Sequence, residues 1–376
     1  MTTRVNQFLA ATRRAAVDRG AFGEVERALQ ALGGDLASEE LPAFVARLHR
    51  RCGDLNRARQ ALKQASTDDD LAVRLERSWL AYYDGGAEFT LAAAFDLIHS
   101  LGSAPQSTDI LTDTLQLVGK RLSDEGWLSC ARDFLLGALG NARLLEDLAG
   151  IAAATGALAE VVALGGHPLA ALTLLRQDEA LLVPGDIDRT RLLVYHGHAF
   201  RMLGTPDADL HAQQRYELAM EVASLGGRAN PWADRGLLWC KALRLAARGA
   251  VSGETCRELC ARAPALGHPG GHARLALAWL ARLSREDGMA EQWTEEAARL
   301  FEQDRYLHEA RWARGEAPQQ APLPRRNVRP PVVALACDAW IGELPLLDFQ
   351  TRMQRSREAW GSRRCDDGRA WMSAFW

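Results

Sequence analysis

Two histidines at alternate positions, His196 and His198, form a pattern that can be part of a metal site. Successive residues on a helix are rotated by about 100°, so two histidines at this spacing point in nearly opposite directions and cannot bind one ion. Zinc in proteins also takes three or four ligands from the chain. We therefore interpret the pair as ordinary residues of a helix face and predict no metal site here.

Two further pairs have the four-residue spacing of side chains that share a helix face. His268 and His272 are separated by Pro-Gly-Gly, which indicates a loop and a helix cap. Cys256 and Cys260 could form a redox couple or half of a zinc site, but a free cysteine in an apolar pattern behaves as a small core residue. The chain has no glycine-rich phosphate loop, nucleophile elbow or triad sequence. The sequence predicts no enzyme, no cofactor and no metal.

Eleven tryptophans could stack on nucleic-acid bases or form an aromatic cage. Those on apolar helix faces favour core packing instead: Trp79, Trp239, Trp279 and Trp293. The charge composition also argues against nucleic-acid binding, because 45 Lys and Arg residues nearly balance 48 Asp and Glu residues. A net charge of -3 gives no overall attraction to nucleic acid or to an acidic membrane. Contact with either one would have to be local.

The cysteines and the apolar runs indicate the compartment. Seven cysteines, an odd number at wide spacings, are unlike a disulfide framework and are typical of a reducing cytoplasm. The first residues contain no apolar signal core, and no run reaches the roughly 18 apolar residues that a membrane span requires. We expect a cytoplasmic protein with no membrane segment.

Apolar residues recur with helical spacing from residue 2 to residue 314. Leu111, Leu115, Val118 and Leu122, for example, fall on one helix face. Glycines punctuate the pattern, and Asp, Ser or Thr nearby supply the caps of the next helix. The pattern predicts roughly sixteen to eighteen helices, joined by short turns.

A small-residue pattern occurs twice in this helical region, 73 residues apart. It consists of Gly53, Ala58, Leu62 and Ala65, and then of Gly126, Ala131, Leu135 and Ala138. Its last two intervals recur in Ala212, Tyr216 and Ala219, and again in Cys256, Cys260 and Ala263. The separation is about twice the roughly 34-residue period of a helical hairpin repeat. The sequence therefore predicts stacked helical hairpins.

These residues resemble the second helix of a tetratricopeptide repeat, where small side chains let neighbouring helices approach and a larger one fills the gap. Gly119 falls where that family has the small residue of its first helix. The resemblance covers about two thirds of the chain, although the family's tryptophan and closing proline are mostly missing and residues 140–190 drift out of phase. It implies an all-α solenoid of tetratricopeptide-like hairpins over residues 1–314. HEAT-like helical repeats are the alternative.

The resemblance also indicates which side chains contact a partner. In tetratricopeptide arrays the first helix of each hairpin lines a concave groove. Mapping that face selects Arg47, Arg50 and Arg51 in one repeat, and Gln116 and Lys120 in another. Such side chains resemble those with which the family binds acidic peptides or C-terminal carboxylates through charge-assisted hydrogen bonds. A solvated basic face is the alternative interpretation.

The chain changes character after residue 314. Residues 315–331 contain five prolines and three arginines and are expected to form an extended linker. Residues 332–376 are expected to form a small α+β tail. Its predicted strands are 332–336 and 340–346, and its predicted helices are 349–360 and 368–375.

This order of elements resembles the first half of the winged-helix module in bacterial activators that also carry tetratricopeptide-like repeats. The segment stops before a recognition helix and wing, so we expect DNA binding to be incomplete. The main prediction is a non-enzymatic scaffold that binds a protein or peptide partner in bacterial regulation. The alternative is a transcriptional regulator with a degenerate DNA-binding module. The sequence leaves the partner and the pathway open, and it is compatible with a homo-oligomer.

Overall fold

The structure is a computed structural model, and it describes most of the chain between residues 41 and 225 together with shorter later segments. The described ranges are 41–51, 55–65, 70–83, 91–101, 109–124, 127–180, 187–203, 206–225, 233–234, 236–238, 240–241, 252, 254, 278, 287–303, 310, 313–314 and 339–346. These ranges contain helices, turns and no strand.

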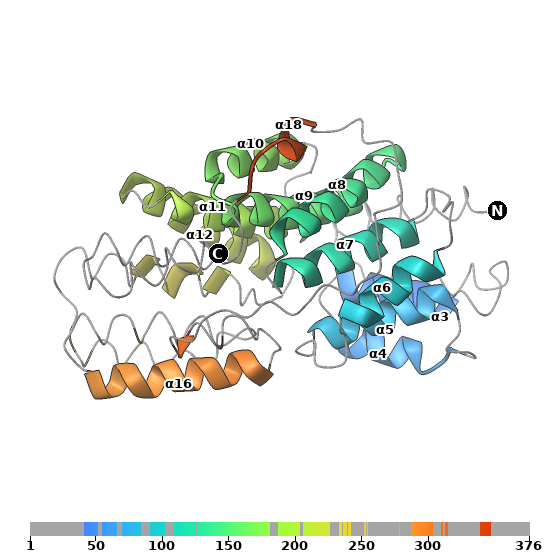
Figure 1. The fold of residues 1–376 in the computed structure, drawn as a ribbon, viewed down its shortest axis with the longest axis horizontal. Coiled ribbons are helices and arrows are strands. Elements are labelled where there is room, and N and C mark those ends of the chain that lie inside the picture. Colours follow the sequence, from blue (N-terminus) through green and yellow to red (C-terminus); the bar gives the residue numbers. More distant parts are fainter. Residues whose placement is uncertain are drawn as a thin grey trace.

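Helical hairpins follow one another in the described part of the chain up to residue 225 (Figure 1). They are α3 (Leu41–Arg51) with α4 (Leu55–Leu62), α5 (Leu71–Tyr83) with α6 (Leu91–Ser100), α7 (Asp109–Asp124) with α8 (Leu128–Leu144), α9 (Leu148–Leu164) with α10 (Pro168–Glu179), and α11 (Ile187–Met202) with α12 (Pro206–Leu225). Beyond them lie α16 (Asp287–Gln303) and the short α18 (Ala339–Gly342). The prediction of an all-α helical-repeat body is confirmed for these residues.

The hairpins stack in register. The first helices contact one another in chain order, α3 with α5, α5 with α7, α7 with α9, and α9 with α11. We call these five helices the first-helix layer. Second helices pack against the first helix of the next hairpin, as α8 does against α9 and α10 against α11. This is the arrangement that the tetratricopeptide resemblance implies.

The small-residue pattern lies where the hairpins meet. Ala58, Ala131, Leu135 and Ala138 are buried on the second helices α4 and α8, and Ala212, Tyr216 and Ala219 are buried on α12. Gly119 of α7 is also needed for close packing, since a Cβ there would lie 2.6 Å from Leu135 Cγ on α8. The predicted roles of these residues in helix packing are confirmed. Cys256, Cys260 and Ala263 lie outside the described residues.

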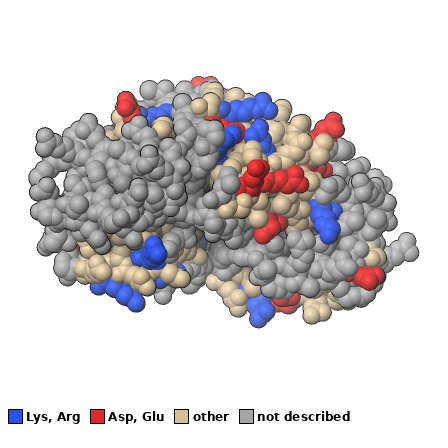
Figure 2. Space-filling view, turned by 180° about the vertical axis from the view of Figure 1, so that it is seen from behind, with Lys and Arg blue, Asp and Glu red and all other residues tan. Residues whose placement is uncertain are grey.

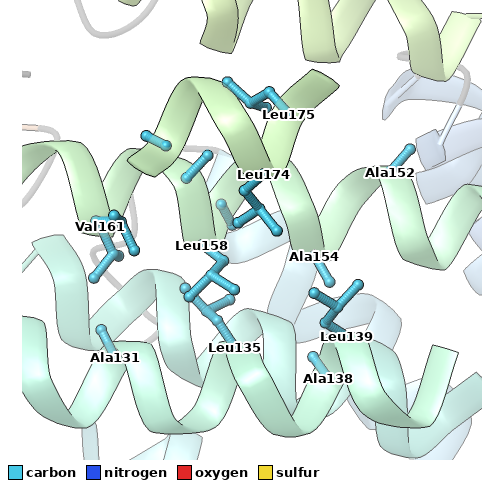
Figure 3. Packing of buried hydrophobic residues seen from close by; sticks show 14 of the residues in the cluster. Ala131, Leu135, Ala138, Leu139, Ala152, Ala154, Leu158, Val161, Leu174 and Leu175 are labelled. Carbon is cyan, nitrogen blue, oxygen red and sulfur yellow. The ribbon is translucent and has the colours of Figure 1, made fainter. Parts of the chain in front are cut away.

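Most of the labelled residues in the core between α8, α9 and α10 are leucine or alanine (Figure 3). Leu135 and Leu158 point toward each other between α8 and α9, and Leu139 lies beside Ala154 (Figure 3). All four side chains are fully buried. A leucine opposite an alanine lets the two helices approach while the space between them stays filled.

The turn between α8 and α9 lies within residues 140–190, where the repeat drifts out of phase, and it ends a helix without glycine. Glu146 has a φ of 53°, in the left-handed region where helices usually end on glycine. The turn between α9 and α10 uses Gly166, with a φ of 96°, for the same purpose. The first of these helix ends therefore has no glycine to mark it in the sequence, whereas the second has one.

The C-terminal prediction is wrong in one described part. The predicted strand over 340–346 is instead the helix α18 followed by a turn and by irregular backbone to Leu346. One turn of helix places Ile341, which is fully buried, against α8. The predicted linker 315–331, the strand 332–336 and the helices at 349–360 and 368–375 lie outside the described residues. Among the described helices, none is both long and apolar enough to cross a membrane.

Candidate partner-binding site

Lys120, one of the predicted partner-binding residues, lies half-buried near the end of α7 in the first-helix layer. Its Nζ donates a hydrogen bond to the Tyr195 hydroxyl of α11 at 3.2 Å. The same nitrogen lies 5.9 Å from the centre of the Tyr195 ring. Tyr83 of α5 and Glu160 of α9 lie close enough to affect its pKa. We call these four residues the Lys120 site.

Glycine on α9 makes this contact possible. A Cβ at Gly156 would lie 2.4 Å from Cδ2 of Tyr195, so any larger residue would force the ring away. With glycine there, the Tyr195 ring lies against the α9 backbone and its hydroxyl reaches Lys120. The site therefore depends on the close packing of α9 and α11.

The electrostatics keep the lysine charged and the tyrosine neutral. Burial disfavours the ammonium ion, but the hydroxyls of Tyr195 and Tyr83 and the Glu160 carboxylate outweigh it, so the pKa of Lys120 is raised. Burial raises the pKa of Tyr195, against the opposing effect of Lys120. An ammonium group has three donors, and Tyr195 accepts from one of them. The arrangement suits binding of an acceptor such as a carboxylate.

The other predicted basic residues have partners within the chain. Arg47 and Arg50 of α3 were expected to face a partner, yet they are only 4% and 6% exposed. Arg50 donates to Glu76 Oε2 at 2.7 Å and to Asp113 Oδ2 at 2.9 Å. Arg47 donates to Glu76 at 3.1 Å and also to Asp109. The expected exposure is wrong because α5 and α7 supply carboxylates that neutralise both guanidinium groups.

Arg50 also lies against an aromatic cluster that leads to the Lys120 site. Its guanidinium carbon is 4.5 Å from the centre of the Trp79 ring. Trp79 stacks on Tyr83 with ring centres 5.7 Å apart. Burial disfavours the charge of Arg50, but Glu76 and Asp113 outweigh it and raise its pKa. A continuous set of contacts thus connects α3 through α5 to Lys120.

The remaining predicted residues contribute less. Gln116 of α7 is 5% exposed, so its side chain belongs to the helix interface. Arg51 ends α3, and its side chain lies outside the described ones. Of the five predicted residues, the structure brings Arg47 and Arg50 into one cluster and places Lys120 in another. Their role in binding a partner remains a prediction.

The sequence interpretation missed Tyr83, Glu160 and Tyr195. Glu160 lies within residues 140–190, where the repeat could not be followed, and Tyr195 follows directly after this stretch. Had the α8–α9 turn been recognised at Glu146, the first-helix mapping could have been extended to α9 and α11. The signal available for that was the polar Glu146-Asp147 pair between two apolar runs.

A second polar cluster joins α10, α11 and α12. His196, fully buried, lies 3.0 Å from Glu179 Oε2, and Arg215 and Arg189 also pair with Glu179. The His196 contact and both arginines lower the pKa of Glu179 to about 2, against the effect of burial. Burial lowers the pKa of His196 although Glu179 opposes it. Within the described residues, no group of three or more His, Cys, Asp or Glu could hold a metal ion.

A pocket of about 380 Å³ adjoins this cluster on the second-helix side. It is lined by Arg176, Phe200, His211, Gln214, Arg215 and Leu218. Its arginines and Glu179 partly compensate one another's charge. Figure 2 shows the molecule from behind, and acidic and basic side chains are interspersed among the described residues of the face that it draws.

The described helices define a class of protein: an all-α chain with a tetratricopeptide-like helical fold. Among solved structures, that of Rap protein complexed with competence and sporulation factor is similar, with a TM-score of 0.51 and 16% sequence identity. The match covers 75% of this chain and 80% of that one. At this identity the likeness concerns the fold. No protein-family model and no curated protein matches the sequence.

Proposed function

We propose that the chain is a non-enzymatic helical-repeat scaffold that binds a protein or peptide partner through the Lys120 site. The observation that carries the proposal is a charged ammonium group, held by Tyr195 and flanked by half-buried Tyr83, in a layer shared by consecutive first helices. Tyrosine is enriched at recognition surfaces, and an ammonium group forms charge-assisted hydrogen bonds with carboxylates. The similar Rap protein was solved with a bound factor, which supports a partner of this kind.

The partner group that this site suits is a carboxylate, from an acidic side chain or a C-terminus. Among the predicted basic residues with described side chains, Arg47 and Arg50 are already paired with Glu76, Asp109 and Asp113, whereas Lys120 donates to the neutral hydroxyl of Tyr195. We place this activity in the cytoplasm, in bacterial regulation. The DNA-binding alternative depends on the tail, and no described residue favours it.

Lys120→Gln tests the proposal. The tagged chain and its variants would be purified from native cells, and bound proteins quantified by mass spectrometry. Because a hydrogen bond to a charged group contributes about 1.5–3 kcal/mol, we expect the specific partner to fall by about tenfold or more. Lys63→Gln is the matched control, since Lys63 is exposed beside the second helix α4.

Circular dichroism would first establish that both variants are folded. A partner retained equally by Lys120→Gln and by the Lys63→Gln control would contradict the assignment of the site. A wild-type chain that retains no specific protein or peptide would contradict the proposed function itself. Direct titration of the purified chain with acidic and amidated versions of the identified peptide would then separate a carboxylate ligand from other acceptors.

A further inference from the structure

The segment 341–346 contacts a surface that precedes it in the sequence by more than 170 residues. This surface is formed by α8 and by the turn between α9 and α10. Figure 1 shows α18 (red) beside α10 and near α8, and far from α16. We call it the latch surface and define it by Arg132, Leu136, Gly165 and His167.

Main-chain carbonyls of the segment are held by side chains of the latch surface. Arg132 Nη1 donates to the carbonyl oxygen of Leu344 at 2.5 Å. His167 Nε2 lies 3.0 Å from the carbonyl oxygen of Pro345, and because a carbonyl only accepts, this nitrogen carries the hydrogen. Every peptide carries backbone carbonyls, so these two contacts do not depend on the side chains of Leu344 and Pro345.

Apolar side chains of the segment give the contact its selectivity. Ile341 is fully buried in the main core cluster, and Leu344 and Leu346 pack at its edge. Leu346 fits only because residue 165 is glycine, since a Cβ there would lie 2.5 Å from Leu346 Cδ2. Pro345 is exposed between the two leucines, and its ring restricts the backbone conformations of Leu344 and Pro345.

We propose that the latch surface is a docking site for the chain's own residues 341–346, a helical turn followed by Leu-Pro-Leu, and that this segment occupies it reversibly in cis. Leu135 and Leu158 fill the space between α8 and α9, so these two helices do not need the segment in order to pack against each other, although Ile341 adds to the core from outside. On this proposal the segment is an exchangeable ligand. This inference is independent of the Lys120 site.

A labelled peptide tests the proposal with the full-length chain. The probe is a fluorescein-labelled peptide of residues 338–347, and its binding is measured by fluorescence anisotropy. A tethered segment competes at an effective concentration of about a millimolar, so we expect the wild-type chain to bind the probe about tenfold or more weakly than an opened variant. The opened variant carries Ile341→Asp and Leu346→Asp, which spoil the cis segment and leave the latch surface unchanged.

Glycine substitutions supply the matched pair on the receptor side. In the opened background, Gly165→Leu fills the position of Leu346 and is expected to abolish probe binding. Gly288→Leu, where a Cβ meets no atom within 4 Å, is expected to leave it unchanged. Gly165 has a φ of -74°, so leucine is compatible with its backbone. A probe with Leu346→Asp should bind about tenfold more weakly, through loss of the same buried contact.

Three results would overturn the proposal. The first is a folded opened variant that does not bind the probe, and the second is a wild-type chain that binds the probe as tightly as the opened variant does. The third is a wild-type dimer in light scattering that disappears in the opened variant, which would show that the segment docks onto a second copy. If the opened variant does not fold, the pair Gly165→Cys and Leu346→Cys replaces it. The Cβ positions lie 3.1 Å apart, slightly closer than in a disulfide, so mild oxidation should link them. An unlinked chain, as read by peptide mass mapping, contradicts docking.

Discussion

Arg50 contacts Glu76, Asp113 and the Trp79 ring, and it is 6% exposed. A guanidinium group in this position compensates two carboxylates that are each about 1% exposed. If the arginine is removed, those carboxylates stay buried without it, which is costly even where the intact ion pair contributes little. The residue predicted to bind a partner therefore has a structural role.

Arg50→Met is expected to lower the free energy of unfolding by about 3–5 kcal/mol, because it breaks a buried ion pair. Urea denaturation followed by circular dichroism measures the change. Arg77→Met, on the exposed side of α5 next to Glu76, should change stability by at most about 0.5 kcal/mol. Equal effects of the two substitutions would show that the cluster of Arg50 is unimportant for folding.

His196 makes stability depend on pH. Its pKa is lowered from 6.5 in the folded chain, so the unfolded chain takes up a proton first as the pH falls. The contribution to stability is present above pH 6.5 and is lost as the pH falls through the lowered pKa. The pKa of Glu179 is lowered from 4.5 to about 2, so its contribution to stability is also lost as the pH falls, between these two values.

His196→Gln is expected to flatten the decrease in melting temperature between pH 6.5 and 5, since glutamine keeps an N–H near Glu179 without titrating. Differential scanning fluorimetry across this range measures it. His99→Gln, at an exposed position of α6, is the control and should keep the wild-type profile. A His196→Gln profile identical to the wild type would rule out this residue as the source.

At the scale of the elements, the turns before and after α9 differ in backbone strain. Glu146 adopts a left-handed φ of 53° before α9, and Gly166 adopts a φ of 96° after it. A left-handed conformation costs a residue other than glycine about 1–2 kcal/mol. The first turn stores this cost, and the second avoids it.

Glu146→Gly is expected to raise the free energy of unfolding by up to about 1 kcal/mol, because the exposed glutamate side chain loses no packing and glycine relieves the backbone. Gly166→Ala should lower it by about the same amount. Paired thermal melts of the two variants measure the effects. Changes of the same sign in both variants would show that backbone strain in these turns does not determine the free energy of unfolding.

At the scale of the whole molecule, two hydrophobic clusters lie among the described helices from α3 to α12. The smaller one joins α3, α4 and α5 around Ala58, Leu62 and Leu80, and the larger one runs from α5 to α12 and includes Ile341. In stacked repeats each hairpin contacts mainly its neighbours, so a local change in stability spreads only along the stack.

Leu62→Ala is therefore expected to increase amide hydrogen exchange in α3, α4 and α5 while α9 to α12 keep their protection. Loss of a buried leucine costs about 2–5 kcal/mol, enough to open the unit formed by α3, α4 and α5. Leu158→Ala, within the larger cluster, should reduce protection in α7 to α12. Hydrogen exchange with mass spectrometry distinguishes this pattern from uniform loss of protection after Leu62→Ala, which would indicate a single cooperative core.

Helix periodicity and the spacing of small residues were readable from the sequence alone, because both depend on local geometry. A helix that must bury Leu111, Leu115, Val118 and Leu122 shows that need in its spacing, and the four are fully buried. Ala131, Leu135 and Ala138 likewise identified α8 as a second helix packed against its neighbours. The balanced charge and the missing catalytic motifs also needed no coordinates.

Only the tertiary structure decided which charges meet. Arg47 and Arg50 are expected at a surface from α3 alone, but Glu76 and Asp113 approach them from other helices and bury them. Lys120 and Tyr195 are 75 residues apart and meet because Gly156 lets α9 and α11 pack closely. The segment 341–346 gave no sign of its distant surface, since contacts with Arg132 and His167 depend on three-dimensional position and leave no period in the sequence.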